Sequence, residues 1–365
     1  MANRILFLSD SNSEHTEKWV LGLADLGFEI GLFSFKEADY DWFSAHPKIT
    51  SLNSKQIPKS SSTFFIKIAY LRMLPELKKI ITEFKPDILH AHYATSYGYL
   101  ARLSGFKPYF ISAWGTDVMK FPYKNIANKL LLKKNLEKAA QLFATSNTIK
   151  KYIQKITNAP VTVIPFGVDI KKYIPREIKR PYSDKTIVIG VIKPIEKIYA
   201  IDIIIKAFSL LVKRCTDCEL KLMIVGIGSE KSNLEKLCKL ENIAEQVNFV
   251  GRVNFSIISD YFNMIDVLVN VSTYESFGVS VIEAMACEKP VIVSNVGGLK
   301  EIVEEGLDGF LIPVNDFEKT SMAIEKLVKN KELRKQFGIN GRQKVIEKYN
   351  WDDNLNQMAK IYLEN

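Results

Sequence analysis

The chain has 365 residues, of which 47% are hydrophobic and 25% are charged, and its formal net charge is +9. This length and composition favour two globular domains and exclude a largely disordered chain. No apolar run approaches the ~20 residues that cross a bilayer, so any membrane contact is expected to be peripheral.

Strands and helices alternate over the first 170 residues. A strand is predicted at residues 4–10 and a helix at residues 15–26. Further strands are predicted at residues 29–35, 87–93, 108–114, 141–146 and 161–168. Such alternation is typical of an α/β domain with a parallel sheet.

A polar stretch with two prolines separates this part from the rest. We predict an N-terminal domain over residues 1–170, a linker over residues 171–185 and a second α/β domain over residues 186–348. A last helix is expected within residues 349–365. Strands of the second sheet are predicted at residues 186–192, 219–226, 247–251, 267–272, 291–295 and 310–314, and helices at residues 201–212, 229–240 and 279–287.

The four cysteines lack the paired spacing of a zinc site. Cys215 and Cys218 form a C-x-x-C, but Cys238 and Cys287 provide no second close pair. With no signal peptide before the first strand, we expect free thiols in a reducing, cytoplasmic compartment.

The positive charge belongs to the N-terminal half. Residues 1–170 carry 22 Lys and Arg against 14 Asp and Glu, whereas residues 171–365 carry 28 against 27. The lysines concentrate in residues 55–85 and 120–138. Such basic, aromatic-bearing stretches suit an anionic membrane surface at the inner face of the cytoplasmic membrane, and a solvated helix face is the equally weighted alternative. Nucleic acid is not expected, because no recognised reading motif accompanies the charge.

In the first of these stretches, apolar residues alternate with the basic side chains of Lys67, Arg72, Lys78 and Lys79.

Two carboxylates flank a turn that opens a helix near residue 279. Ser276, Phe277 and Gly278 lie at the predicted helix N-terminus, where unpaired N–H groups attract a diphosphate. Glu275 and Glu283 are eight positions apart, slightly more than two helical turns, and so project from much the same side. Ionised carboxylates only accept hydrogen bonds, which makes hydroxyls their natural partners: a transferred sugar for Glu275 and a ribose for Glu283.

This segment reads E-S-F-G-x-x-x-x-E-A-M-A and continues through Pro290-Val291-Ile292, the Gly297-Gly298 pair, Glu301 and Gly306-x-x-Gly309. It resembles the donor-binding motif of the retaining glycosyltransferases of family 4, and the resemblance covers nearly the whole chain. It implies a GT-B fold, in which two Rossmann-like domains face each other across a cleft. It also implies that the last helix returns to the first domain.

The family has Gly-Arg-Leu and then a Lys-Gly pair where this chain reads IGVIKPIEKIYAID at residues 189–202, so the Arg is missing. The resemblance implies that Lys193, Lys197 or both neutralise the donor diphosphate. Lys197 aligns with the family lysine, Lys193 is placed to replace the Arg, and surface lysines without a role are the alternative. The donor-binding residues implied in this way are Glu283, Ser276, Phe277, Gly278, Val279, Gly190, Gly226, Gly251, Arg252 and Val253.

The first domain departs from the family. Trp114 stands where a histidine is common, which leaves Asp117 and His92 as catalytic candidates, and a core histidine is an equal alternative for His92. We expect His90 and His92 to alternate, so that only one faces a given side. The acceptor side is predicted to include Asn12, His15 and Trp114, with Ser13 beside them.

The triplet Asp39-Tyr40-Asp41 matches the metal-diphosphate signature of another glycosyltransferase fold. It is predicted to be a chance match, because the residues before it are polar rather than an apolar strand. The resemblance therefore implies catalysis without a metal or other cofactor, with the helix N-terminus and lysines in place of a cation.

The implied function is retaining transfer of a hexose from a nucleotide-sugar, with UDP most expected, to a saccharide or lipid-linked acceptor in cell-surface polysaccharide or glycolipid synthesis. Two alternatives stay open. One is a GT-B sugar-nucleotide epimerase. The other is a non-catalytic sugar-nucleotide-binding partner of a membrane assembly.

Overall fold

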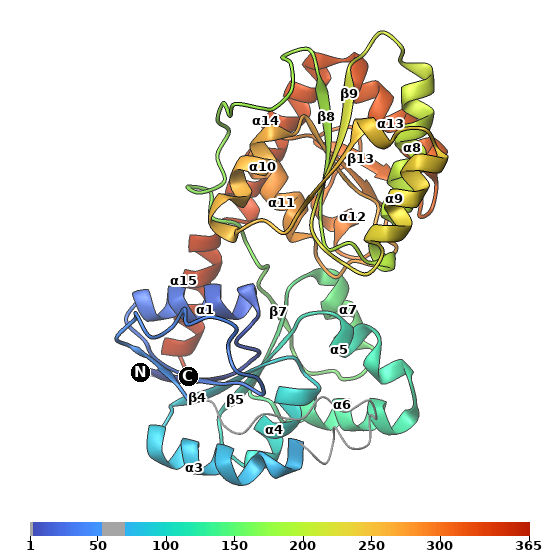
Figure 1. Ribbon diagram of the computed structural model, residues 1–365. Coiled ribbons are helices and arrows are strands. Elements are labelled where there is room, and N and C mark those ends of the chain that lie inside the picture. Colours follow the sequence, from blue (N-terminus) through green and yellow to red (C-terminus); the bar gives the residue numbers. More distant parts are fainter. Residues whose placement is uncertain (1–2, 53–69) are drawn as a thin grey trace. The chain divides into compact units, whose positions relative to one another are not determined.

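The computed structural model describes residues 3–52 and 70–365 (Figure 1). The chain divides into two compact units. The first combines Met1–Phe166 with Asp352–Asn365, and the second is Gly167–Trp351. Each unit contains one sheet, so the α/β class predicted from strand–helix alternation is confirmed.

The first unit is built on a seven-stranded sheet in the order β3-β2-β1-β4-β5-β6-β7. Every pairing in it is parallel. The sequence did not predict β3, because three residues of one strand are too few to show a pattern. The strands are β1 (Arg4–Leu8), β2 (Glu29–Phe33), β3 (Ile49–Ser51), β4 (Ile88–His92), β5 (Tyr109–Ala113), β6 (Gln141–Ala144) and β7 (Thr162–Val163).

Helices cover both faces of this sheet, with α1 on one face and α3, α4 and α6 on the other (Figure 1). The C-terminal helix α15 (Trp351–Leu363) packs within the same unit. Its Tyr362 is fully buried and stacks on Phe110, with ring centroids 5.9 Å apart. The remaining helices of the unit are α1 (Glu14–Asp25), α3 (Leu74–Phe84), α4 (Ser96–Ser104), α5 (Thr116–Met119), η1 (Phe121–Tyr123), α6 (Ile126–Lys138) and α7 (Asn147–Gln154).

The second unit has a six-stranded sheet in the order β10-β9-β8-β11-β12-β13. All its pairings are parallel, and this order is that of a Rossmann-like sheet. The strands are β8 (Ile187–Ile192), β9 (Leu220–Val225), β10 (Val247–Gly251), β11 (Val267–Asn270), β12 (Val291–Ser294) and β13 (Gly309–Ile312).

A continuous apolar core joins this sheet to the helices α8, α9 and α13. In α8, Ile201, Ile204, Ile205 and Phe208 follow the i, i+3, i+4, i+7 spacing of one helical face, and all are buried. The helices of the unit are η2 (Lys197–Tyr199), α8 (Ile201–Arg214), α9 (Lys231–Leu240), η3 (Ala244–Gln246), η4 (Phe255–Ile257), α10 (Ile258–Met264), α11 (Val279–Ala286), α12 (Leu299–Ile302), α13 (Phe317–Lys329) and α14 (Lys331–Lys348).

The stretch predicted as a linker, residues 171–185, belongs to the second unit. The backbone N–H of Arg176 donates to the side chain of Asn263 at 3.0 Å. The guanidinium of Arg180 lies 2.8 Å from the carboxylate of Asp266. These contacts join separated parts of the chain, which explains why the local polarity of the stretch did not reveal them.

Candidate active site

The second sheet has its topological switch point at β8 and β11, which are adjacent although β9 and β10 lie between them in sequence. In open α/β sheets, the loops that leave such strands diverge, and ligands bind beyond the carboxyl ends of the strands. The loop after β8 begins at Lys193, and the loop after β11 leads to Glu275. The chain therefore places two predicted site residues at this edge.

Lys193 and Glu275 form an ion pair between Nζ and Oε2. Their side chains are 11% and 14% exposed, so the pair is largely shielded from water. The ammonium also lies 4.7 Å from the ring centroid of Tyr199, a distance at which a cation is attracted to an aromatic face. The sequence predicted Lys193 and Glu275 as separate site residues. It predicted neither their contact nor the position of Tyr199 beside the ammonium.

The two loops are also bonded to each other through their backbones. Thr273 donates from its N–H and its hydroxyl to the carbonyl of Ile198, at 2.9 and 3.1 Å. This contact fixes the short helix η2, in which Lys197 is exposed. In the part of the chain that the structure describes, Lys197 forms no ion pair, so its charge is available to a ligand.

The turn that carries Glu275 rests on the Gly297-Gly298 pair. Gly298 donates from its N–H to the carbonyl of Glu275 at 3.1 Å. A Cβ at Gly297, whose φ is +47°, would lie 1.8 Å from that same carbonyl oxygen. A Cβ at Gly298 would lie 2.5 Å from the Cα of Phe277. The pair is therefore glycine because the backbone of the turn occupies the space of a side chain.

Helix α11 begins at Val279 behind Gly278, as predicted, and the first-turn N–H groups of a helix have no partner within it. Glu283 lies one turn further along and is half-buried. The hydroxyl of Ser280 is buried, and no described residue hydrogen-bonds to it. Ser280 was not predicted as a site residue, and the only signal for it was its position in the first turn.

Two of the glycines predicted to bind the donor, Gly190 and Gly226, are tightly packed, and so is Gly228. A Cβ at Gly190, inside β8, would lie 2.4 Å from the side chain of Ile265. At Gly226 and Gly228 a Cβ would meet the carbonyls of Lys193 and Ile195 at 1.9 and 2.1 Å. The Gly226-x-Gly228 turn thus packs closely against the loop after β8. The prediction that Gly190 and Gly226 bind the donor stays a prediction.

Gly251 differs from these glycines, because no atom lies within 4 Å of its hypothetical Cβ. It ends β10 with a φ of +88°, and its carbonyl accepts from the N–H of Gly226 at 2.9 Å. Arg252 is exposed and Val253 is half-buried. The prediction that these three residues bind the donor stays a prediction.

In the first unit, β1 and β4 form the corresponding switch point. Nδ1 of His92 lies 2.9 Å from the hydroxyl of Ser9. That hydroxyl lies 2.6 Å from the hydroxyl of Thr16, so a buried chain of three polar groups ends at the histidine. Burial, followed by the nearby His90 and His15, lowers the pKa of His92 well below its usual value, which keeps the ring neutral.

The expectation that His90 and His92 face opposite sides is wrong. Residues two apart on a strand project from the same face, and the two ring centroids are 5.0 Å apart. His90 is the core histidine, bonded to the hydroxyl of Tyr362 and, at 2.9 Å, to that of Ser112. Burial lowers the pKa of His90 to about 3.

Aromatic rings surround the other predicted acceptor residues. The ring of His15 stacks on Phe166 with centroids 3.8 Å apart, and it meets Trp114 edge-on at 5.8 Å. Trp114 in turn lies 4.5 Å from His92. Burial, with a smaller contribution from Lys18, lowers the pKa of His15 to about 4. The structure thus brings His15, His92 and Trp114 together.

Asp117 and Asn12 have structural partners instead. The carboxylate of Asp117 is buried and accepts from the N–H groups of Ala94 and Gly115, each at 2.8 Å. The amide of Asn12 donates to the carbonyl of Glu37 at 2.9 Å and accepts from the N–H of Asp39 at 2.6 Å. Asp117 joins the ends of β4 and β5, and Asn12 holds a loop, so these contacts give no support to the predicted catalytic and acceptor roles.

In the Asp39-Tyr40-Asp41 triplet, the side chain of Asp41 accepts from the N–H of Ser44 at 3.0 Å. Among residues 3–52 and 70–365, no group of three or more His, Cys, Asp and Glu side chains is placed to hold a metal ion. Metal independence of the reaction stays a prediction.

Two family models match the chain, one to each unit. "Glycosyl transferase 4-like" matches residues 4–146, and "Glycosyl transferases group 1" matches residues 175–344. The chain belongs to the family 4 glycosyltransferases, and its two Rossmann-like units are those of the GT-B fold. It is an enzyme of the glycosyltransferase class.

Three similar proteins illustrate the match. An uncharacterized glycosyltransferase of Methanocaldococcus jannaschii is 28% identical, over 96% of this chain and 93% of its own. The N-acetyl-alpha-D-glucosaminyl L-malate synthase of Bacillus anthracis is 27% identical, over 76% of this chain and 74% of its own. The Anabaena protein HepE, solved in complex with UDP, has a TM-score of 0.80 at 17% identity, over 99% of this chain and 100% of its own.

The helices of the described residues include none that is both long and apolar enough to cross a membrane.

Proposed function

We propose that the protein transfers a hexose from a UDP-sugar to a saccharide acceptor carried on a lipid, with retention of anomeric configuration and without a metal ion. The proposed setting is cell-surface polysaccharide or glycolipid synthesis at the inner face of the cytoplasmic membrane. The observation that carries the proposal is the ion pair between Lys193 and Glu275 at the switch point of the second sheet. The choice of UDP as the nucleotide is supported by HepE, which shares the fold and was solved in complex with UDP.

The donor would lie along α11. The carboxylate of Glu283 accepts hydrogen bonds from the ribose hydroxyls, and that of Glu275 accepts them from hydroxyls of the transferred sugar. The first-turn N–H groups of α11 and the hydroxyl of Ser280 face the diphosphate, whose negative charge is stabilised at a helix N-terminus. This arrangement holds the bond between the sugar and the diphosphate between the carboxylate of Glu275 and the N-terminus of α11.

The two lysines would divide their tasks. The charge of Lys193 is already balanced by Glu275, so its task is to orient that carboxylate toward the sugar. Lys197 is exposed and outside any ion pair formed by described residues, so its task is to neutralise the diphosphate. Charge stabilisation of the departing phosphate lowers the barrier to breaking its bond with the sugar.

Retention follows when the acceptor hydroxyl attacks the anomeric carbon from the side of the leaving group. The bond from that carbon to the phosphate oxygen breaks, the new glycosidic bond forms, and the departing phosphate oxygen takes the acceptor proton. No enzyme carboxylate acts as a nucleophile in this scheme. The neutral ring of His92 offers a hydrogen-bonding group without charge.

The division of tasks is tested by titrating UDP and a UDP-sugar into the wild type and two matched variants. Lys197→Met is expected to weaken the binding of both ligands by ~10- to 100-fold, the worth of a charge-assisted hydrogen bond. Lys193→Met is expected to change UDP affinity by less than about threefold while weakening the UDP-sugar by about tenfold or more. Lysine variants that bind both ligands as the wild type does would refute this donor site. GDP or ADP binding in preference to UDP would refute the choice of nucleotide.

A further inference from the structure

We propose that η1, α6 and α7 of the first unit form one surface that docks on an anionic lipid membrane. The inference deepens the proposed function and rests on its lipid-carried acceptor, since it names the face by which the enzyme reaches the lipid. It starts from three large apolar side chains that the fold leaves in water. Tyr123, Ile126 and Leu130 are 55%, 71% and 53% exposed.

The two exposed apolar residues of α6 lie on one face. Ile126, Leu130, Lys133 and Glu137 are spaced by four, three and four positions, which places them in one row along the helix. The opposite face holds the buried residues Asn128, Leu132, Asn135 and Leu136. The exposed row is therefore not part of the core, and its two apolar residues have no burial partner within their own helix.

An aromatic contact joins η1 to α7, and a shared pocket joins α7 to the row on α6. Tyr123 meets Tyr152 of α7 edge-on, with ring centroids 6.2 Å apart. The ammonium of Lys155 lies 4.7 Å from the centroid of Tyr152. Lys155 and Lys133 both line a pocket of about 400 Å³ between α6 and the end of α7. Tyrosine, with an apolar ring and a polar hydroxyl, is enriched where lipid meets water.

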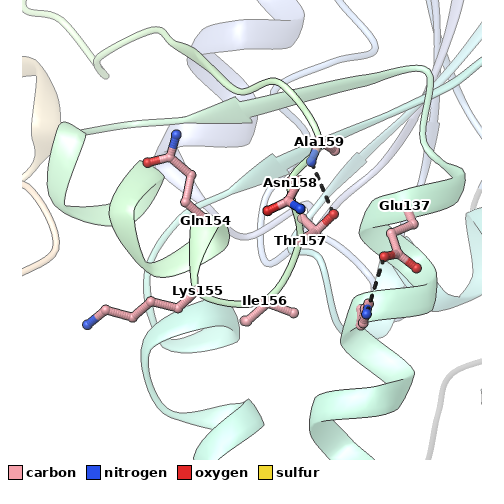
Figure 2. Close-up of a pocket in the computed structure, with 8 residues that line it drawn as sticks. Glu137, Gln154, Lys155, Ile156, Thr157, Asn158 and Ala159 are labelled. Atoms are coloured by element: carbon pink, nitrogen blue, oxygen red, sulfur yellow. Dashed lines mark hydrogen bonds and ion pairs between the residues drawn. The ribbon is translucent and has the colours of Figure 1, made fainter.

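Figure 2 shows this pocket, with Glu137 on the α6 side and Gln154, Lys155, Thr157 and Asn158 on the other. Glu137 is paired with Lys133 at 3.6 Å across one turn of α6. Two ammonium groups and neutral amides thus stand beside the exposed apolar row, where lipid phosphates would lie if Ile126 and Leu130 entered the headgroup layer.

The charge of the region fits an anionic surface. Residues 118–168 contain one acidic residue, Glu137, and nine lysines: Lys120, Lys124, Lys129, Lys133, Lys134, Lys138, Lys150, Lys151 and Lys155. Lysines near a membrane are attracted by anionic lipids over about a Debye length. Their long aliphatic stems let the ammonium reach the lipid phosphates while apolar side chains are buried. Exposed apolar side chains flanked by lysines suit contact with the headgroup layer of an anionic membrane.

The other basic stretch predicted from the sequence, residues 55–85, is not part of the proposed surface. Lys67, with residues 53–69, lies outside the described residues. Arg72, Lys78 and Lys79 are exposed, and Lys79 pairs with Glu83 at 3.7 Å across one turn of α3. Lys78 and Lys79 therefore offer a control of equal charge in the same unit.

The test is flotation of the full-length protein with phosphatidylcholine vesicles, with and without phosphatidylglycerol. Ile126→Ser/Leu130→Ser is expected to lower the partition coefficient at least about tenfold, because two exposed side chains no longer enter the lipid. Lys133→Gln/Lys155→Gln is expected to lower it about 25-fold on anionic vesicles, from about fivefold per lysine. Lys78→Gln/Lys79→Gln is expected to change it by less than about twofold, and Leu240→Ser, at a residue 78% exposed in the second unit, should leave it unchanged.

Three results would overturn the inference. One is equal binding to neutral and anionic vesicles. Another is an equal loss in the Lys78→Gln/Lys79→Gln control. The third is displacement of the vesicles by an RNA oligonucleotide that the Ile126→Ser/Leu130→Ser variant still binds at full affinity, which would assign the lysines to nucleic acid. Stabilisation by UDP, measured on the same variants, reports separately on the donor site. A failed membrane test therefore leaves the proposed activity intact, and a failed donor test leaves the membrane inference intact.

Discussion

At the scale of single residues, burial determines the charge of the histidines in the first unit. His15 and His90 have pKa values lowered to about 4 and about 3, because their rings are surrounded by other side chains. A folded-state pKa below the unfolded value of ~6.5 means that the unfolded chain binds more protons between these values. This contribution to stability is therefore full above pH ~6.5 and is lost as the pH falls toward 4.

We predict that replacing His15 flattens the pH dependence of unfolding. His15→Phe keeps an aromatic ring between Phe166 and Trp114 but removes the titration. Between pH 6.5 and 4 the free energy of unfolding should fall less steeply than in the wild type, by up to about 1.4 kcal/mol per pH unit. Burial raises the pKa of Asp117, which acts in the opposite direction, but it is common to both proteins and cancels in the difference. Denaturant titrations at several pH values measure this, and parallel curves would contradict it.

The sequence could indicate which residues are chemically suited to the site but not which of them touch. Glu275 and Lys193 were both predicted, yet their ion pair depends on the adjacency of two strands about 80 residues apart, which no local pattern shows. Asp117 was predicted as a catalytic candidate because Trp114 stands where the family commonly has a histidine. In the structure its carboxylate accepts from two backbone N–H groups, which no local pattern shows, and its catalytic role stays a prediction.

At the scale of elements, the turn between β11 and α11 depends on the glycines of another turn. We predict that Gly297→Ala moves the backbone of Glu275, since the new Cβ would lie 1.8 Å from its carbonyl oxygen. A displacement of about 1 Å at a substrate-positioning group can cost ~100-fold in rate, so we expect kcat/KM to fall by about that factor.

Gly306→Ala is the matched control for this prediction. Gly306 also has a positive φ, of +77°, but no atom lies within 4 Å of its hypothetical Cβ. It should lose ~1–2 kcal/mol of stability to backbone strain and keep its activity. Equal losses of activity in both variants would show that strain, and not the contact with Glu275, causes the effect.

Strands were predicted well where apolar runs were long. The packing of glycines against residues of another loop was not predicted. The strands of both sheets other than β3 were found from their apolar runs, within two residues at each end except for β7, where the predicted strand runs five residues too far. Gly226 was predicted to bind the donor, and this role stays a prediction. The structure shows in addition that Gly226 and Gly228 admit the carbonyls of Lys193 and Ile195, a contact between separate loops that no local pattern reveals.

At the scale of the whole molecule, the alternation of strands and helices was enough to predict two α/β units with parallel sheets. The resemblance to family 4 added the expectation that the last helix returns to the first domain. In the structure, residues 352–365 group with the first unit, where the buried Tyr362 bonds to His90. The stretch taken for a linker belongs to the second unit through partners far along the chain.

The most direct test of the account is transfer of label from a radiolabelled UDP-sugar panel to lipid extract by the whole enzyme in EDTA, with the anomeric configuration of the product determined. We predict transfer from one UDP-sugar, with a product that keeps the anomeric configuration of the donor. In Glu283→Ala, both the transfer and the stabilisation of the protein by UDP should be lost. Inversion, or a requirement for added metal, would contradict the proposed mechanism. Turnover of the donor without any acceptor would indicate an epimerase, and no turnover with every acceptor, despite intact UDP binding, would contradict the proposed activity itself.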